Sequence, residues 1–443
     1  MRVSVVGTGY VGTVTAAGLA EIGNDVVCVD LDLAKVEAIN DGTTLIYEVG
    51  LDDLVARNAG KRLRAVVDTR DAVAETDLTL IAVDTPFGGE EIDLSSIEKA
   101  SAEIGRALRD KPDYHVVVVK STVVPGTTEA VVLPILEENS GKTAGADFGV
   151  GMNPEFLREG QAVADFLRPD RIVLGGIDER TRLAMAEMYR SFVGAEIFHT
   201  DTRTAELIKY ASNSLLATLI SYSNELANLA SKLGVDSNEV MRGVHLDRRL
   251  TPMLEDGSRL EPGILSYLLP GCGFGGSCFP KDVRSLIAFG SQMGASLPVL
   301  EAVMEVNETQ PQRMVELLKR RIPDLSQVPV AILGVAFKPG TDDVRESPAI
   351  RIAEDLLSEG AIVTIVDPVA NDQAEAIFGE RVAYEAKYDQ IADSTEAFLL
   401  VTAWPQFAGL PDHMTGRSNQ PVMVDGRRFF SKKDFTRYEG IGL

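Results

Sequence analysis

Short apolar runs and longer stretches of helical spacing alternate along the first third of the chain. Residues 2–7 form an apolar run, helical spacing follows to about Ile22, and a second apolar run, Asp25–Val29, ends at Asp30. This order of strand, helix and strand is typical of a β-α-β unit. Further strand-like runs are Leu78–Val83, Val116–Lys120 and Phe148–Met152, with helical stretches that include Ser95–Leu108 and Glu129–Glu138. The alternation predicts a parallel, doubly wound sheet.

One long stretch of helical spacing lies in the middle of the chain, from Arg203 to about Leu233, and it contains no glycine or proline. Its apolar positions form one broad face. They are Leu207, Ile208, Ala211, Leu215, Leu216, Leu219 and Ile220. A helix of ~30 residues is ~45 Å long, which exceeds the width of a small domain. We therefore expect this helix to join two domains and to form the contact surface of a homodimer.

A third block repeats the order of strand, helix and strand. Val330–Gly334 predicts a strand, Ser347 opens a helix, and Ala361–Val366 predicts a strand that ends at Asp367. The expected fold class is therefore α/β, with two Rossmann-like doubly wound parallel-sheet domains joined by a central helical domain with one long helix. The expected boundaries are 1–200 for the first sheet domain, 201–300 for the helical domain and 301–443 for the second sheet domain.

The composition is that of an ordinary globular protein, and it limits the partners of the chain. The 443 residues exceed what one hydrophobic core normally organises, and 45% of them are hydrophobic and 25% charged. The net charge of -23 disfavours nucleic acids and anionic membranes, because both are bound mainly through Lys and Arg. An anionic substrate would need a locally basic pocket. The acidic excess serves solubility or reflects a salty cytoplasm.

Neither a leader segment nor a membrane segment is indicated. The first residues run directly into a strand, without a basic segment followed by an apolar one. The apolar runs are much shorter than the ~20 residues that a membrane-spanning helix needs. The 3 cysteines, Cys28, Cys272 and Cys278, and the 4 histidines lack the spacing of disulfide frameworks or metal sites. We expect a cytoplasmic protein that needs no metal.

A glycine-rich turn, Gly7-Thr8-Gly9-Tyr10-Val11-Gly12, follows the first predicted strand. Gly7 permits the tight turn, Gly9 lets the backbone approach a pyrophosphate, and Gly12 lets the helix pack on the strand. The start of the helix then faces the anion. Asp30, at the end of the second strand, would accept a hydrogen bond from the adenosine ribose 2′-hydroxyl and would repel a 2′-phosphate. The pattern predicts NAD as the cofactor.

A single thiol stands in the glycine-rich segment Gly273-Phe274-Gly275-Gly276-Ser277-Cys278-Phe279-Pro280-Lys281-Asp282. The glycines allow a ligand to approach closely, and a nearby cation lowers a thiol pKa from ~8.5 toward neutrality. From these residues alone, Cys278 is either a nucleophile or a structural cysteine. Cys28 is expected in the core, and Cys272 is expected to be a spectator.

Further motifs extend through the rest of the chain. They are Lys120-Ser121-Thr122-Val123-Val124-Pro125-Gly126-Thr127, Asn153-Pro154-Glu155-Phe156-Leu157-Arg158-Glu159-Gly160, Lys209-Tyr210-Ala211-Ser212-Asn213 and Phe337-Lys338-Pro339-Gly340-Thr341-Asp342-Asp343-Val344-Arg345-Glu346-Ser347-Pro348. With these, the turn and the cysteine segment, nearly the whole chain resembles the UDP-glucose/GDP-mannose dehydrogenase family. The resemblance implies that the C6 alcohol of a nucleotide-linked hexose is oxidised to a carboxylate, with two hydrides passed to two NAD molecules.

The resemblance also implies how the reaction proceeds. The Cys278 thiolate would hold the aldehyde as a thiohemiacetal, and the second oxidation would leave a thioester that water hydrolyses. Lys209 and Asn213, one helical turn apart, match the pair that stabilises the developing oxyanion. Thr122 and Asp282 match residues that position the hydrolytic water.

The remaining roles concern proton transfer and ligand contacts. Glu155 matches a carboxylate proposed as general acid or base, and Glu159 is the neighbouring candidate. The sequence does not distinguish between these two carboxylates. The expected cofactor contacts are Gly7, Gly9, Tyr10, Val11, Gly12, Asp30, Lys35, Thr85, Thr122 and Arg345. The expected substrate contacts are Phe156, Leu157, Lys209, Asn213, Arg249, Tyr267, Leu268, Gly275, Lys338 and Arg427. Among these, Arg249 resembles an arginine that reaches the neighbouring active site of a dimer.

Several functions stay open at this stage. The stretches Glu159-Gly160 and Phe166–Val173 resemble UDP-glucose dehydrogenases more than GDP-mannose dehydrogenases, which implies UDP-glucose as substrate, with UDP-N-acetylhexosamines and GDP-mannose as the alternatives. The chain departs from the family pattern at Asp84, near the expected cofactor phosphates. A two-electron hydroxyacid or hydroxyacyl dehydrogenase would share the turn and the long helix without needing Cys278. A silent nucleotide-binding regulator would need no thiol either.

Overall fold

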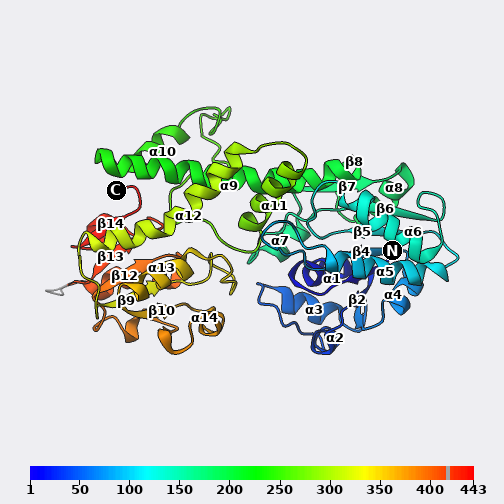
Figure 1. The fold of residues 1–443 in the computed structure, drawn as a ribbon, viewed down its shortest axis with the longest axis horizontal. Helices are drawn as coiled ribbons and strands as arrows, with labels where there is room; N and C mark the ends of the chain where they lie inside the picture. The colour runs from blue at the N-terminus through cyan, green and yellow to red at the C-terminus, as the bar shows by residue number, and fades with distance from the viewer. Residues whose placement is uncertain (416–419) are drawn as a thin grey trace. The chain divides into compact units, whose positions relative to one another are not determined.

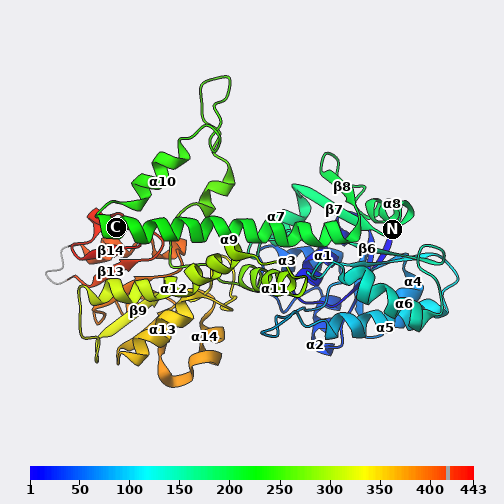
Figure 2. The ribbon, with the colours of Figure 1, turned by 45° about the horizontal axis from the view of Figure 1, so that its top comes forward.

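The computed structural model describes residues 1–415 and 420–443, which form two compact units, Met1–Ser212 and Asn213–Leu443. Each unit contains one sheet. The helix α9 (Thr202–Leu233) begins in the first unit and ends in the second, and it runs without interruption (Figures 1 and 2). The long central helix predicted from its spacing is therefore confirmed, with its start one residue earlier than expected.

The first unit is built on an eight-stranded sheet of order β3-β2-β1-β4-β5-β6-β7-β8 (Figure 1). The strands are β1 (Arg2–Val6), β2 (Asp25–Val29), β3 (Leu63–Val66), β4 (Leu78–Ile81), β5 (His115–Val119), β6 (Phe148–Met152), β7 (Arg171–Gly176) and β8 (Glu196–Thr200). The first six strands are parallel, whereas β7 runs antiparallel to β6. Their order reverses between β1 and β4, and dinucleotides bind at the carboxyl ends of strands at such a reversal.

Helices cover both faces of this sheet. They are α1 (Tyr10–Glu21), α2 (Leu33–Asn40), α3 (Leu51–Asn58), α4 (Thr69–Glu75), α5 (Ser95–Arg109), a π-helix (Thr128–Val132), α6 (Leu133–Ser140), α7 (Ala162–Leu167) and α8 (Glu179–Met188). Val116 and Val118 of β5 lie in the apolar cluster on one face, and Val117 and Val119 lie in the cluster on the other. A central strand buried on both sides explains why four successive positions, Val116 to Val119, are apolar.

The second unit contains a parallel six-stranded sheet of order β11-β10-β9-β12-β13-β14. Its strands are β9 (Pro329–Leu333), β10 (Ile362–Val366), β11 (Ala383–Glu385), β12 (Ala397–Leu400), β13 (Val422–Asp425) and β14 (Tyr438–Gly440). Its helices are α10 (Ser237–His245), α11 (Phe279–Gln292), α12 (Pro298–Lys319), α13 (Pro348–Ser358), α14 (Asn371–Phe378) and α15 (Leu410–Met414), with short 3-10 turns such as Gly263–Tyr267. The sheet has the same strand order as the first six strands of the other unit.

The predicted fold class is confirmed, since two Rossmann-like sheets flank a helical middle. The three-part division at residues 200 and 300 stays a prediction. The boundary at residue 300 is hard to draw because helix α12 contributes to two apolar clusters. Val303 and Met304 pack with α11, while Met314 and Leu318 lie in the core under the second sheet.

The acid after the second strand differs between the two sheets. Asp367 follows β10 as Asp30 follows β2, but Asp367 is fully buried. Its carboxylate accepts hydrogen bonds from the backbone N–H groups of Val335 (2.8 Å) and Ala336 (3.1 Å) and from the indole of Trp404 (3.1 Å). The N–H groups of Val369 and Ala370 complete the set, each at 3.0 Å. The N–H groups of the turn after β9 thus already donate to the carboxylate of Asp367.

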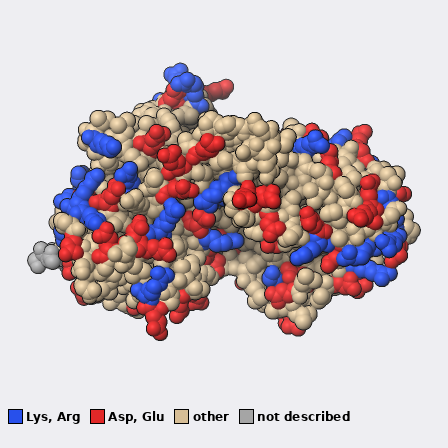
Figure 3. Space-filling view, in the orientation of Figure 1, with Lys and Arg blue, Asp and Glu red and all other residues tan. Residues whose placement is uncertain are grey.

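Charged side chains of both signs are interspersed over the face drawn in Figure 3. Within residues 1–415 and 420–443, no helix is long and apolar enough to cross a membrane. Over the same residues, His, Cys, Asp and Glu form no group of three or more that could hold a metal ion.

Candidate active site

The glycine-rich turn between β1 and α1 has the shape that a pyrophosphate needs. Gly7 has a φ of +95°, and a Cβ there would lie 2.7 Å from the carbonyl oxygen of Ala82. A Cβ on Gly12 would lie 1.9 Å from the carbonyl oxygen of Gly7, so the helix packs directly on the turn. A Cβ on Gly9 would meet open space within 4 Å, and no side chain caps the helix there. The first N–H groups of α1 therefore suit an anion at Gly9.

Asp30 lies beside this turn and remains a carboxylate. Its Oδ2 accepts hydrogen bonds from the N–H (2.8 Å) and the hydroxyl (2.6 Å) of Thr8, and Lys35 Nζ lies 3.6 Å away. Burial alone would raise the pKa of Asp30, but the hydrogen bonds from Thr8 and Asp32 and the charge of Lys35 bring it below its usual value. A cavity of about 220 Å³, lined by Thr8, Gly9, Tyr10 and Lys35 among others, adjoins it. These groups fit the adenosine end and the pyrophosphate of NAD.

Replacing Asp30 with alanine is expected to weaken NAD binding and to improve NADP relative to NAD, because the ribose 2′-hydroxyl loses its acceptor and a 2′-phosphate loses its repulsion. Cofactor titrations by fluorescence or calorimetry measure the two affinities. Asp32→Ala is the matched control, since Asp32 caps α2 through the N–H of Ala34 at 2.9 Å. That change should cost ~1 kcal/mol of stability and leave the NAD/NADP ratio unaltered. An unaltered ratio in Asp30→Ala would remove the assignment.

A buried ion pair joins two of the candidate catalytic residues. Lys209 Nζ on α9 donates to Glu155 Oε1, just after β6, at 2.6 Å, and the two side chains are 3% and 5% exposed. Leu157 N–H donates to the other carboxylate oxygen at 2.6 Å. Burial would raise the pKa of Glu155, but the Lys209 ammonium, the Leu157 N–H and the charge of Lys120 outweigh it and lower this pKa. Glu155 is therefore ionised at neutral pH, and a proton acceptor is available beside Lys209.

The loop after Glu155 is fixed at both ends. The carboxylate of Glu48, itself buried, accepts from the N–H groups of Gly160 (2.5 Å) and Ala162 (2.8 Å) and from the Tyr10 hydroxyl. Tyr10 of the glycine-rich turn and the loop residues Gly160 and Ala162 thus donate hydrogen bonds to the same carboxylate. Glu48 was not predicted as a site residue.

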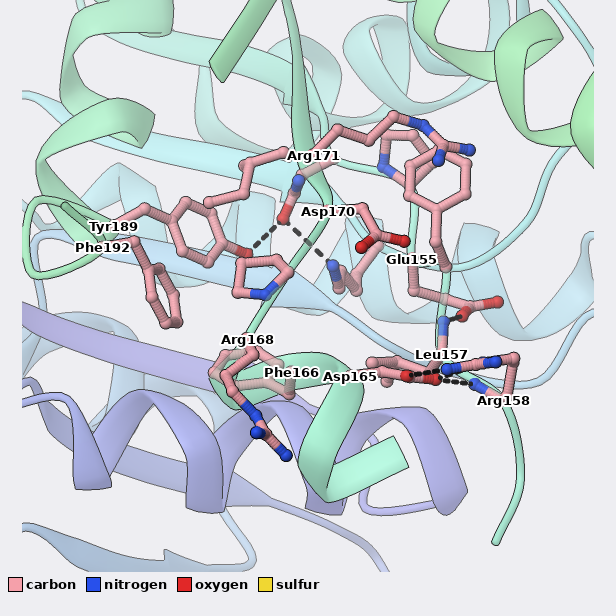
Figure 4. Close-up of a pocket in the computed structure, with 16 residues that line it drawn as sticks. Glu155, Leu157, Arg158, Asp165, Phe166, Arg168, Asp170, Arg171, Tyr189 and Phe192 are labelled. Carbon is pink, nitrogen blue, oxygen red and sulfur yellow. Dashed lines mark hydrogen bonds and ion pairs between the residues drawn. The ribbon is translucent and has the colours of Figure 1, made fainter. Parts of the chain in front are cut away.

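Other predicted residues of the first unit lie around this loop. The Phe156 ring lies under the Arg171 guanidinium, 4.0 Å from its centroid, and Lys209 Nζ lies 5.8 Å from the same centroid. Figure 4 shows Arg171 above the loop that carries Glu155 and Leu157, and Arg158 paired with Asp165. On the neighbouring strand end, Thr85 Oγ1 donates to the carbonyl of Thr122 at 2.9 Å. Glu159 has a buried oxygen in the same loop.

Cys278 lies in the second unit, at the N-cap of α11. It is partly exposed, and its Sγ lies 3.6 Å from Ser277 Oγ. The N-terminus of a helix favours negative charge, so this position suits a thiolate. The glycines before it are required by packing as well: a Cβ on Gly275 would lie 2.3 Å from the Glu346 carbonyl, and Gly276 has a φ of +84°. The segment is held against the loop that ends at Ser347.

Asn213 and Asp282 lie together in the same unit as Cys278. Asn213 Nδ2 donates to Asp282 Oδ2 at 2.6 Å, and both side chains are buried. The N–H of Asp282 donates to the Cys278 carbonyl at 2.8 Å, which is the first turn of α11. Lys281 Nζ lies 2.8 Å from Asp282 Oδ1. The structure thus brings the candidate nucleophile, an amide donor and a carboxylate onto adjoining turns of two helices.

A cavity of about 580 Å³ in the second unit collects predicted substrate contacts. Tyr267, Gly275, Lys338 and Arg427 line it, together with apolar groups such as Phe279. Arg427 is fixed there by hydrogen bonds to the carbonyls of Val401 (2.7 Å) and Gly273 (3.3 Å). Two cations and aromatic rings around one cavity suit a nucleoside diphosphate.

The structure does not bring every predicted contact to these cavities. Arg249 is on the loop after α10, where it is highly exposed and pairs with Asp247. Arg345 pairs with Asp343 of its own loop at 2.7 Å. Leu268 is buried beside the cavity that Tyr267 lines. The ligand contacts of all three stay predictions.

The comparisons with known proteins agree with this geometry. A doubly wound sheet with an open glycine turn and an acid after its second strand is the arrangement that binds NAD, and the matched family is one of NAD-dependent oxidoreductases. Residues 1–193 match the NAD-binding domain of one family, residues 203–309 its central domain, and residues 331–432 its UDP-binding domain. The chain belongs to the UDP-glucose/GDP-mannose dehydrogenase family.

Relatives with assigned activities extend over the whole chain. A UDP-glucose 6-dehydrogenase of Haloferax volcanii is 43% identical over 446 residues and covers 100% of both chains. A GDP-mannose 6-dehydrogenase of Pseudomonas aeruginosa is 41% identical and covers 96% of this chain and 93% of its own. The solved structure of a UDP-glucose dehydrogenase from Pyrobaculum islandicum is 41% identical, with a TM-score of 0.90 over 100% of this chain and 98% of that one.

Proposed function

We propose that this enzyme oxidises UDP-glucose at C6 to UDP-glucuronate and reduces two NAD per sugar. The observation that carries the proposal is Cys278 at a helix N-terminus, beside the Asn213–Asp282 pair, in a unit whose cavity presents Lys338 and Arg427. A thiol is what a four-electron oxidation needs between its two steps, because it holds the aldehyde covalently. The Haloferax and Pyrobaculum relatives support UDP-glucose as the sugar nucleotide.

The side chains of this chain would act in sequence. Bound NAD supplies the acceptor for each hydride. Glu155 takes up the alcohol proton, directly or through Lys209, while the Lys209 ammonium and the Asn213 amide donate to the oxygen that becomes negative. The Cys278 thiolate then adds to the aldehyde carbon, and its oxygen takes a proton to give the thiohemiacetal. Loss of a second hydride and a proton leaves a thioester at Cys278.

Hydrolysis of the thioester completes the reaction. Water adds to the thioester carbon, the C–S bond breaks, and the carboxylate and the Cys278 thiol are released. We propose that Asp282 orients this water, because it is one turn along α11 from Cys278 and is held by Asn213. We propose Thr122, which follows β5 in the first unit, as the second group that orients it.

A panel of nucleotide sugars, with NADH counted per sugar consumed, tests the proposal. Two NADH per UDP-glucose are expected. GDP-mannose is the second candidate because a relative of this activity is 41% identical, and UDP-N-acetylhexosamines complete the panel. One NADH per substrate would indicate a two-electron dehydrogenase, and no reduction with any sugar would indicate a nucleotide-binding regulator.

We also propose a homodimer that forms through α9. Leu215, Tyr222 and Leu229 are spaced by seven residues and are 53%, 47% and 53% exposed, so one face of the helix presents an apolar stripe. The double change Tyr222→Glu and Leu229→Glu is expected to give monomers in sedimentation or light scattering. Val193→Glu is the control, because Val193 is 98% exposed in a loop before β8. A wild-type chain that sediments as a monomer would exclude this dimer.

Two further expectations concern the surroundings of the enzyme. We propose the cytoplasm as its place of action, because all three cysteines carry thiols, as is usual in a reducing compartment. We propose that Arg249 contacts substrate only in such a dimer, since in one chain it lies on an exposed loop.

A further inference from the structure

Lys120 is the first residue after β5 and is buried although its side chain carries an amine. It is 5% exposed, and its Nζ donates to Asn153 Oδ1 at 3.1 Å. The same oxygen accepts from the Tyr189 hydroxyl at 2.6 Å, a side chain that Figure 4 shows pointing inward from the edge of the pocket. Asn153 is neutral, so this hydrogen bond alone does not compensate a buried charge. A neutral donor could make the same hydrogen bond to Asn153 with a smaller desolvation cost.

The compensating charge lies in the neighbouring ion pair. Lys120, Asn153 and Glu155 line the same pocket, and the negative charge of Glu155 raises the pKa of Lys120 while the charge of Lys120 lowers the pKa of Glu155. Burial and the like charge of Lys209 lower the pKa of Lys120 to about 8. Lys120, Glu155 and Lys209 thus behave as one buried cluster of two cations and one anion. Without Lys120 the pair of Lys209 and Glu155 would be neutral.

The reaction places one negative charge against this cluster. Both the oxidation of the alcohol and the addition of the thiolate build charge on the same C6 oxygen. A neutral ion pair attracts such an oxygen weakly, because the carboxylate repels it almost as strongly as the ammonium attracts it. A cluster with one excess positive charge attracts the oxyanion both while Glu155 is ionised and after Glu155 has taken up the alcohol proton.

We propose that Lys120 is a positioning residue that supplies this excess positive charge, so that Lys209 can donate to the developing oxyanion although Glu155, the acceptor of the alcohol proton, lies beside it. The inference rests on the proposed function and deepens it. Lys120 acts through Lys209 and Glu155 and does not need to touch the sugar.

Other charged or titratable groups around the pocket do not replace this charge. They are Arg158, Asp165, Arg168, Asp170, Arg171 and Tyr189. Arg158 pairs with Asp165, and Arg171 stacks on Phe156 and donates to Ser212. Arg168 and Asp170 are exposed, where water screens them. Lys120 is buried to the depth of Glu155, each residue being 5% exposed.

The test is the full-length variant Lys120→Met, which keeps the length of the side chain and removes the charge. Below pH 8 we expect kcat to fall roughly 10- to 100-fold, less than for a donor that touches the oxyanion, with both KM values within about threefold of wild type. The ratio of wild-type to variant kcat should narrow above pH 8, where the wild-type lysine loses its proton. An unchanged kcat, or a ratio independent of pH, would overturn the inference.

Two controls separate charge from packing. Tyr189→Phe removes the other donor to Asn153 without changing any charge, and it should leave kcat within about threefold. Lys111→Met removes another buried lysine, which donates to the carbonyls of Val73 and Ala74, and should cost stability only. A loss of kcat in Tyr189→Phe equal to that in Lys120→Met would show that Lys120 serves packing.

The outcomes also distinguish this inference from the proposed function. Two NADH per UDP-glucose in wild type together with full activity in Lys120→Met would overturn the inference and leave the function in place. If wild type oxidises no sugar, the proposed function is wrong. The melting temperatures of wild type and Lys120→Met at different pH values then test whether Lys120 is a buried charge. The folded-state pKa lies below the unfolded value of 10.5, so wild type should gain stability relative to Lys120→Met as pH rises from 8 to 10.5. A stability difference between wild type and Lys120→Met that does not change with pH would exclude a buried charge at Lys120.

Discussion

Replacing Cys278 with serine is expected to lower the rate of complete oxidation to the carboxylate by on the order of 10⁴-fold or more, the scale seen when a covalent nucleophile is lost from a preorganised site. A hydroxyl at the N-cap of α11 is a far weaker nucleophile than a thiolate, so no thioester forms. The first oxidation does not need the sulfur. The yield should therefore fall from two NADH per sugar toward one, with the aldehyde found by trapping with a hydrazine. NADH absorbance and mass spectrometry of the sugar measure both quantities.

Cys272→Ala is the matched control for this change. Cys272 is fully buried in the core of the second unit, and burial raises the pKa of its thiol, so it is a poor nucleophile. The variant should keep kcat within about threefold and lose ~1 kcal/mol of stability. Full activity of Cys278→Ser, or a covalent sugar adduct on Cys272, would contradict the proposed mechanism.

Replacing Lys209 with methionine is expected to reduce both activity and stability. Loss of a donor to the oxyanion should lower kcat 10²- to 10³-fold, or roughly 3–4 kcal/mol. Glu155 would lose its ion-pair partner and keep only the N–H of Leu157 and the charge of Lys120, so the cost should approach the about 3–5 kcal/mol of breaking a buried ion pair. The double variant Lys209→Met and Glu155→Gln removes that charge. We therefore expect the double variant to regain most of the lost stability in urea or thermal unfolding while its activity stays low.

An exposed ion pair provides the comparison. Lys319 and Glu359 lie 2.6 Å apart, and their side chains are 37% and 40% exposed. Lys319→Met should change stability by less than about 1 kcal/mol and leave kcat unchanged, because water screens such pairs. If Lys209→Met cost no more stability than this control, Glu155 would not be held as a buried carboxylate. If the double variant regained activity, Lys209 would have no part in the chemistry.

Most elements of the two sheets could be predicted from hydrophobic spacing, since their central strands are buried on both faces. The limits of β2 and β6 agree with the predicted ranges, and α9 differs by one residue at its start. The antiparallel strand β7 was harder to foresee, because Arg171–Gly176 is apolar in the same way as a parallel strand. Strand direction depends on the connection through α7, not on local composition.

The candidate site was predictable where the chemistry requires a particular residue type in a motif. Cys278, Asn213 and Asp282 lie together in one unit, and Lys209 and Glu155 form an ion pair in the other. Lys120 and Glu48 were missed because they act through other side chains, and their partners are 33 or more residues away along the chain. The signal for Lys120 was its position directly after four valines, at the carboxyl edge of the sheet, because a lysine that is buried there is rare and needs a charged partner.

The closed turn at Asp367 bears on the order of events during turnover. Its carboxylate already holds five N–H groups, the donors with which a second Rossmann-like sheet could have received a dinucleotide. We therefore expect the NAD site of the first unit to serve both oxidations. Spent NADH has to leave and fresh NAD has to enter while the sugar is half oxidised. The proposed covalent bond to Cys278 would keep the reactive aldehyde from diffusing away during that exchange.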